Sequence, residues 1–326
     1  MTDSVRIEKY KKDVEQERAL WQMNEILAQL EDQIAPRVDA PEHPLLFIVG
    51  CPRTGTTLLG QMLASSGLFA YVSNFVARFW LAPWLGANIG LALGLARLSS
   101  PSNLESTFGQ TTGWTEPHEF GYFWDRWFEF GETAKLNERQ LAKIDRTKMK
   151  RAFAALQAAY DRPMFFKNQN KYSLQIEFLA ELFNNAYFVL LERHPLYQTQ
   201  SVLLARKEFC GDINIWWTMR PKEYPILKEL SPYEQIAGQT YYLSQDIWAS
   251  LKKLSKDRYL ALTYEDLCAS PRDVVTQVAR LVGINSGSDD LLEILPETIT
   301  LSKKQQIPQD QWISLQAACK KYGLIE

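Results

Sequence analysis

The sequence predicts an α/β fold in which a central, mostly parallel sheet lies between two layers of helices. Two patterns carry this prediction. Strand-length segments alternate with segments of helical periodicity, which is typical of a doubly wound sheet. The first strand-length segment, 45–50 (LLFIVG), is apolar throughout, as expected of a strand that is covered on both faces. At 326 residues the chain can bury one large core.

The remaining elements continue this alternation along the chain. Residues 75–160 interrupt it with a mainly helical pattern, so they are predicted to form an inserted layer. We expect residues 1–326 to form a single domain that begins with a long N-terminal helix inside 1–40. The other strands are predicted at 70–73, 163–167, 187–192 and 258–263, and the helices at 4–34, 56–66, 173–184, 196–208, 232–256 and 271–283.

Composition and charge narrow the classes of function. The formal net charge is −2, with 46% hydrophobic and 23% charged residues, so no global positive field indicates a nucleic-acid partner. Four cysteines lie far apart without a zinc-binding spacing, so neither a metal nor a disulfide framework is expected. The charged N-terminus lacks the apolar core of a signal peptide, and a cytoplasmic location is expected.

An uncharged segment, 79–96, allows three interpretations. It is barely long enough for a membrane span and contains one proline and three glycines, so a span is the weakest of them. A buried or lid helix is favoured. A surface that touches a membrane or receives a lipid, with peripheral contact through 79–98, stays open.

The strongest local signal is a glycine-containing loop, 50–57 (GCPRTGTT), between the first strand and the next helix. The spacing from Gly50 to Gly55 matches a phosphate-binding loop, or P-loop, whose backbone N–H groups surround an anion at a helix N-terminus. Thr56 stands where nucleotide triphosphatases have their lysine, and Arg53 carries the positive charge instead. This difference argues against ATP or GTP hydrolysis. An ordinary strand–turn–helix corner is the alternative.

Three segments in order resemble the sulfotransferase family. CPRTGTTLL (51–59) is similar to that family's 5′-phosphosulfate loop, and FVLLERHPLYQTQS (188–201) resembles its second motif, with His194 in place of the usual Asp. LTYEDLCASP (262–271) resembles a third segment. The resemblance covers most of the chain except its two ends and the insertion. It implies a P-loop-type three-layer α/β sandwich, with the helical insertion on the acceptor side.

The resemblance also implies a donor, 3′-phosphoadenosine 5′-phosphosulfate (PAPS), and no metal. Sulfuryl transfer from this donor goes to a hydroxyl group of an acceptor. Residues implied to bind the 5′-phosphosulfate are those of the loop: Arg53, Thr54, Gly55, Thr56 and Thr57.

The 3′-phosphate is assigned to Arg193 and Ser201. Arg193 follows a predicted central strand, at the edge where open α/β sheets bind ligands, and a guanidinium can bind a phosphate through two hydrogen bonds. Ser201 lies early in the next helix. A surface ion pair for Arg193 and a packing role for Ser201 are the alternative. Tyr264 is placed near the adenine by the resemblance alone, and it could equally be a core aromatic.

The chemistry of transfer calls for cations and for a base near the acceptor hydroxyl. Lys167 ends the strand 163–167, where the family commonly has a lysine directed at the sulfuryl group; a solvated charge is the alternative. For the base we favour Glu119 over His118, with Glu116 third, because enzymes with this style of loop often use a glutamate. The helix of this segment is predicted to begin after Glu116.

The acceptor is expected to be a small or lipid-like molecule with a sizeable apolar part. This expectation depends on two segments lining one cavity, the uncharged 79–96 and the aromatic 120–128. The sequence does not indicate the oligomeric state. At the C-terminus, Lys303 and Lys304 could substitute for the family's basic segment over the 3′-phosphate, or form a solvated turn.

Two other functions share the loop and the sheet. One is a nucleotide kinase or triphosphatase, against which the missing loop lysine and the eight-residue spacing from Arg193 to Ser201 argue. The other is a non-catalytic nucleotide-binding module that associates with membranes. Detectable sulfate transfer would distinguish an enzyme from the second.

Overall fold

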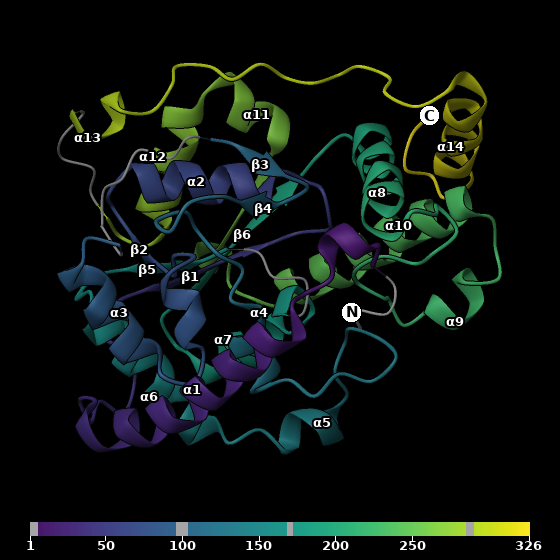
Figure 1. Cartoon of the computed structure of the whole chain (residues 1–326). Helices are drawn as coiled ribbons and strands as arrows, with labels where there is room; N and C mark the ends of the chain where they lie inside the picture. The colour runs from purple at the N-terminus through teal and green to yellow at the C-terminus, as the bar shows by residue number, and fades with distance from the viewer. Residues whose placement is uncertain (1–5, 96–103, 168–171, 285–289) are drawn as a thin grey trace.

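A five-stranded parallel sheet lies at the centre of the computed structural model, in the order β2-β5-β1-β6-β7 (Figure 1). The structure describes residues 6–95, 104–167, 172–284 and 290–326. All five strands were predicted, within two residues at each end. Their bounds are β1 Leu45–Val49, β2 Ala70–Tyr71, β5 Met164–Phe166, β6 Ala186–Glu192 and β7 Tyr259–Thr263.

Strand β1 shows why its sequence is apolar throughout. All five of its residues are buried, and alternate side chains enter two separate hydrophobic cores. Leu46 and Ile48 pack with residues of α2 (Thr56–Ser65) and α12 (Pro271–Leu281) on one side. Phe47 packs on the other side with residues of α4 (Gly121–Asp125), α6 (Arg146–Ala158) and α7 (Ile176–Leu182). Helices therefore cover both faces of the sheet, as Figure 1 shows, and the three-layer α/β prediction is confirmed.

The helices begin and end at the following residues. On the α2 side lie α2 Thr56–Ser65, α11 Tyr264–Ala269 and α12 Pro271–Leu281. The others are α1 Val14–Ile34, α3 Pro83–Ala92, α4 Gly121–Asp125, α5 Glu138–Ala142, α6 Arg146–Ala158, α7 Ile176–Leu182, α8 Pro195–Cys210, α9 Tyr224–Leu227, α10 Pro232–Leu251, α13 Asp290–Glu293 and α14 Gln309–Lys321. Short 3₁₀ turns are η2 Glu8–Tyr10, η3 Val76–Phe79, η4 Tyr172–Leu174 and η5 Lys256–Arg258.

The N-terminal helix begins ten residues later than predicted. Asp13 precedes α1, and its carboxylate accepts the N–H groups of Glu15 and Gln16 at 2.9 and 3.0 Å. This N-cap satisfies donors that have no partner within the helix and so fixes where the helix starts. Residues 8–10 form a separate 3₁₀ turn. The predicted helix 232–256 likewise ends earlier, at Leu251.

The insertion 75–160 is less helical than predicted near the site. A small antiparallel hairpin, β3 Ser106–Thr107 and β4 Gln110–Thr111, turns through Gly109 at φ 96°. His118 and Glu119 are not on a helix, because α4 begins only after Phe120, which has a left-handed φ of 55°. The backbone N–H of His118 instead donates to Val72 O at 2.9 Å, just beyond β2. This contact holds the segment at the carboxyl edge of the sheet.

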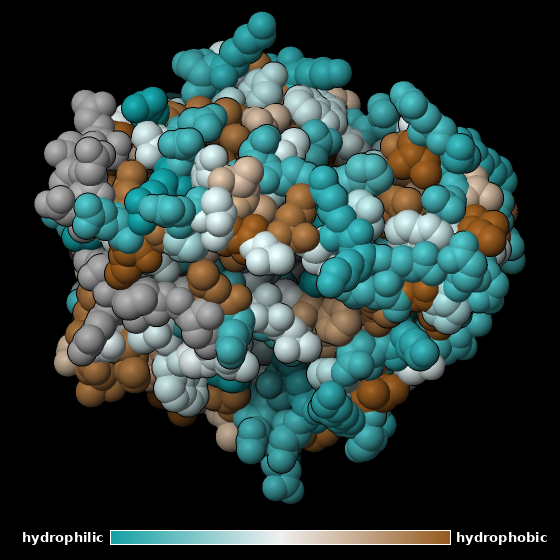
Figure 2. All heavy atoms as spheres, turned by 90° about the horizontal axis from the view of Figure 1, so that it is seen from above, coloured by the Kyte–Doolittle hydropathy of each residue, from teal (hydrophilic) through white to brown (hydrophobic). Residues whose placement is uncertain are grey.

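The uncharged segment folds partly into α3; residues 96–98, the end of the range 79–98 considered for membrane contact, lie outside the described residues. Helix α3 contacts η3, α6 and α1, and Ile89 and Leu93 are exposed, the latter by 63%. Figure 2 shows hydrophobic side chains gathered at the lower left of the face, on the side where Figure 1 places α3. No helix in the described parts of the chain is long and apolar enough to cross a membrane.

Glu31 connects α1 to the start of α3 and gives the fold a pH dependence. Its buried Oε2 accepts the N–H of Leu85 at 2.9 Å, in the first turn of α3. Burial raises the pKa of Glu31 to about 7, although this hydrogen bond opposes the rise. Because the folded pKa exceeds the unfolded one, folding favours the protonated form, and this contribution to stability is lost as pH rises from about 4.5 to 7.

Glu31→Gln is therefore expected to remove this loss. A glutamine can still accept the Leu85 N–H but cannot ionise. Between pH 5 and pH 8 the wild type should lose about 1–3 kcal/mol of unfolding free energy relative to the variant, measured by urea unfolding at both values. Glu25→Gln, at an exposed position of the same helix, is the control. The same pH difference in Glu31→Gln as in wild type would contradict the assignment.

Candidate active site

The glycine loop forms a concave backbone turn between β1 and α2. Arg53 and Gly55 have positive φ angles of 72° and 96°, and Gly55 is the N-cap of α2. A Cβ added at Gly55 would overlap the ring of Tyr264, so only glycine fits there. Thr54 is buried, and its hydroxyl donates to Cys51 O at 3.1 Å. The side chain of Thr54 thus stabilises the loop, leaving its backbone N–H to face an anion.

Two arginines line the cavity at this loop, Arg53 within it and Arg193 just after β6. Arg53 Nε donates to Ser201 Oγ of α8 at 3.0 Å. The guanidinium of Arg193, just after β6, lies 4.5 Å from the ring centre of Tyr264. Burial, together with the charge of Arg193, lowers the pKa of Arg53 to about 10. Among the described residues neither arginine forms an ion pair with a carboxylate, so an anion would relieve this repulsion between the two cations.

Lys167 and Glu119 also lie beside the loop, close to Gly109 of the β3–β4 hairpin. The buried Lys167 Nζ donates to Gly109 O at 2.7 Å and lies 3.9 Å from Glu119 Oε1. Thr57 Oγ1 donates to the same carbonyl at 3.5 Å. The β3–β4 hairpin therefore holds the ammonium group of Lys167 in place. This hairpin was not predicted from the sequence, where Phe108-Gly109 is its local signal.

Protein surrounds Glu119 on several sides, even though water in the cavity reaches 44% of its side chain. This burial raises the pKa of Glu119, while the positive charges of Lys167 and Arg53 oppose the rise. Burial likewise lowers the pKa of Lys167, against the effect of Glu119. A carboxylate held near a cation with a raised pKa has the properties of a general base.

His118 and Glu116 have contacts that suit other roles. His118 Nδ1 accepts the N–H of Phe120 at 2.8 Å, so it carries no proton, and the neutral ring carries its proton on Nε2. Although the residue is exposed to the cavity, the surrounding protein, followed by the charges of Lys167, Arg78 and Lys12, lowers the pKa of His118 to about 3. Its Nε2–H is a hydrogen-bond donor. Glu116 is buried and accepts Gln61 Nε2 at 2.8 Å.

One cavity of about 1570 Å³ joins both groups of residues. It is lined by Arg53, Thr57, His118, Glu119, Lys167, Arg193 and Tyr264. Of the two segments expected to supply its apolar wall, only Trp80, Gly121, Tyr122 and Asp125 line it. Phe123 and Trp124 pack in the core against Phe153 instead. The aromatic wall comes mainly from other segments: Tyr10, Phe108, Trp114, Phe130, Phe209, Trp216, Trp217 and Tyr224.

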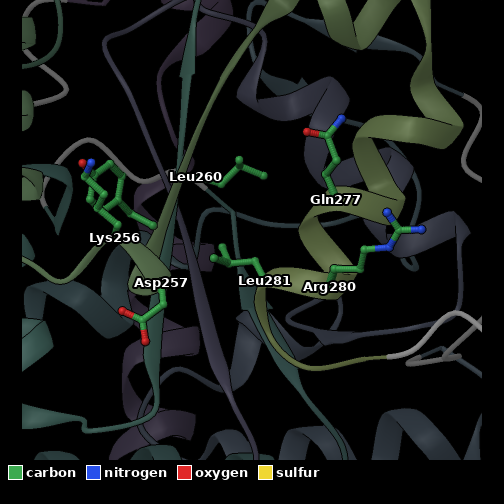
Figure 3. A pocket seen from close by; sticks show the side chains of 7 residues that line it. Lys256, Asp257, Leu260, Gln277, Arg280 and Leu281 are labelled. Atoms are coloured by element: carbon green, nitrogen blue, oxygen red, sulfur yellow. The ribbon is translucent and has the colours of Figure 1, made fainter.

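A second hollow of about 460 Å³ lies on the far edge of the sheet (Figure 3). Lys256 and Asp257 lie beside β7 there, facing Gln277 and Arg280 of α12. None of the predicted site residues lines it.

Comparison with known proteins agrees with the motifs. A profile of the sulfotransferase family matches residues 44–288. The chain belongs to the sulfotransferase family. No curated protein matches it significantly by sequence.

Solved structures support the fold of this sulfotransferase. It is similar to sulfotransferase STF9 from Mycobacterium avium, with 17% identity, a TM-score of 0.53, and coverage of 82% of this chain and 71% of that one. It is also similar to STF1 from Mycobacterium tuberculosis H37Rv, with 13% identity, a TM-score of 0.53, and coverage of 82% and 75%. At such identities the likeness concerns the fold.

The C-terminal segment of the sulfotransferase lies beside Arg193 and α8. Arg193 Nη2 donates to Ser302 O at 3.3 Å, and Gln200 Nε2 donates to Lys304 O at 3.1 Å. Both contacts use backbone carbonyls, and Lys303 and Lys304 are exposed. The segment is therefore close to the residues expected to bind the 3′-phosphate, although the structure assigns the two lysines no partner there.

Proposed function

We propose that this enzyme transfers a sulfuryl group from PAPS to a hydroxyl of a partly apolar acceptor. The observation that carries the proposal is the convergence of Arg53, Ser201 and Arg193 on a glycine loop at the carboxyl edge of a parallel sheet. Such a loop binds one phosphate-type group through its N–H groups, and Arg193 offers a separate site for a second. PAPS carries anionic groups at both its 5′ and 3′ positions.

The residues around Glu119 fit an in-line displacement. The acceptor oxygen would form a bond to sulfur while the bond from sulfur to the 5′-phosphate oxygen breaks. Glu119 would take the proton of the acceptor hydroxyl, and Lys167 and Arg53 would stabilise the negative charge on the sulfuryl oxygens and the leaving phosphate. The Nε2–H of His118 can orient the acceptor but has no free lone pair for a proton.

The acceptor side of the cavity supports a partly apolar acceptor. Phe108, Trp114 and Trp217 contribute aromatic surface, while Lys12 and Arg78 contribute charge. A mixed lining of this kind binds a molecule with a hydrocarbon or aromatic body and a few polar groups.

The desulfated donor, 3′-phosphoadenosine 5′-phosphate, is expected to raise the melting temperature far more than ATP does. Arg193→Ala should weaken this ligand about tenfold or more, because a hydrogen bond to a charged group contributes about 1.5–3 kcal/mol. Thermal shift and titration calorimetry would measure both effects. Arg151→Ala, at an exposed arginine paired with Asp39, is the control. Equal, magnesium-dependent stabilisation by ATP would instead indicate a nucleotide kinase or triphosphatase.

A further inference from the structure

Arg78 is a cavity residue that the chemistry proposed above does not use. It belongs to η3, and its carbonyl accepts Asn24 Nδ2 of α1 at 2.8 Å, which fixes its backbone. Its side chain lines the cavity and is exposed there. Among the residues that the structure describes, it makes no ion pair. An arginine held in a concave wall without a carboxylate is available to an anion from outside.

The neighbours of Arg78 make this end of the cavity a donor-rich site. The Nε2–H of His118 is there, and the charges of Arg78 and Lys12 both act on that ring. Lys12 Nζ contacts the Tyr122 hydroxyl and lies 3.1 Å from Glu17. Glu17 and Asp125 also line the cavity, but Glu17 already pairs with Lys12. Among the described residues of this wall, Arg78 thus has a guanidinium that no carboxylate pairs with.

This end is distinct from the place expected for the donor's phosphates. Those groups face Arg53 and Arg193, which come from the loop after β1 and the end of β6. Arg78 comes from η3, two residues before Trp80, whose ring lies 4.7 Å from that of Tyr122. The N–H of Phe75, just before η3, donates to Trp114 O at 3.0 Å. The apolar and charged groups at this end are therefore placed to bind the acceptor.

We propose that the acceptor carries an anionic group, a carboxylate or phosphate, bound by Arg78 with the Nε2–H of His118 and Lys12. This inference rests on the proposed function, because it names the class of acceptor for that same site. The guanidinium binds the two oxygens of such a group, and the aromatic wall contacts the body of the molecule. Binding the anion away from Glu119 directs a hydroxyl elsewhere in the acceptor toward the base.

The test uses two probes that differ only in charge, decyl phosphate and decanol. Each is titrated into the full chain saturated with 3′-phosphoadenosine 5′-phosphate, so that the donor's two phosphate sites are filled. We expect wild type to bind decyl phosphate at least about tenfold more tightly than decanol. Arg78→Ala should lose that difference and keep its affinity for decanol. Arg78→Lys should retain part of it, and Arg151→Ala, outside the cavity, should retain all of it.

Two results would overturn the proposal: unchanged binding of decyl phosphate by Arg78→Ala, or decanol binding as tightly as decyl phosphate in wild type. The melting temperature of each variant without ligand verifies folding. Failure of the nucleotide to bind would count against the donor assignment alone. The titration is then repeated in Arg193→Ala with and without the Arg78 substitution, so that the acceptor site is still tested.

Discussion

Glu119→Gln is expected to slow single-turnover sulfuryl transfer by about 10²- to 10⁴-fold, which is the usual contribution of a general base. Glutamine keeps the size and the hydrogen-bonding oxygen of the side chain but cannot take a proton. His118→Gln is expected to have a smaller effect, because His118 Nδ1 already accepts the Phe120 N–H and its Nε2 is a donor. Rapid-quench measurement of sulfate transfer to a hydroxyl acceptor compares the two variants.

The pH dependence provides a second measurement of the same assignment. Burial raises the pKa of Glu119, and the carboxylate form is the active one. The wild-type rate should therefore increase with pH on its acidic side, and this increase should be absent in Glu119→Gln. Binding of 3′-phosphoadenosine 5′-phosphate, measured separately, should stay unchanged. A near-normal rate for Glu119→Gln would show that Glu119 is not the base.

The sheet and its loop could be predicted because their signals are local. A strand buried on both faces needs apolar side chains at every position, as 45–49 has. The turn through Gly55 requires a residue without a Cβ beside Tyr264. The start of α1 also has a local signal, the N-cap Asp13. The prediction placed the start of the helix ten residues too early because it extended the helix past this cap into the charged segment before it.

The acceptor side could not be predicted in the same way because its contacts are between distant segments. The sequence showed that 120–128 is rich in aromatic residues, but it could not show that Trp124 packs against Phe47 rather than lining the cavity. The hairpin strands β3 and β4 have two residues each, too short for any periodicity. The hairpin contributes to the site through Gly109 O, which accepts a hydrogen bond from Lys167, a residue far along the chain.

The proximity of Lys167 to Glu119 could be predicted only in part. Sequence placed Lys167 and Glu119 each near the site, but their separation of 3.9 Å depends on a backbone contact from His118 to Val72. That contact replaces the helix that the segment was predicted to form. Glu119 and His118 are therefore distinguished by their hydrogen bonds and not by lying on different faces of a helix.

Lys167→Met is expected to reduce the transfer rate by about 10²- to 10³-fold, the usual loss when one group stabilising a developing negative charge is removed. Lys167 is buried, and its positive charge opposes the rise that burial causes in the pKa of Glu119. Without it, the pKa of Glu119 should rise further. The increase of rate on the acidic side should then shift to higher pH, which a rate–pH profile of the variant measures.

Lys143→Met, at a lysine that is 71% exposed, is the matched control for the loss of charge and should leave both rate and profile unchanged. Lys167→Gln separates the two functions of Lys167, since an amide can still donate to the Gly109 carbonyl but carries no charge. A loss of rate together with the same shift in pH would attribute both effects to the charge. A loss of rate in Lys167→Met alone, with an unshifted profile, would instead show that Lys167 acts by holding the β3–β4 hairpin. In that case Arg53 would be the cation that stabilises the sulfuryl oxygens, because its charge is the other one that acts on Glu119.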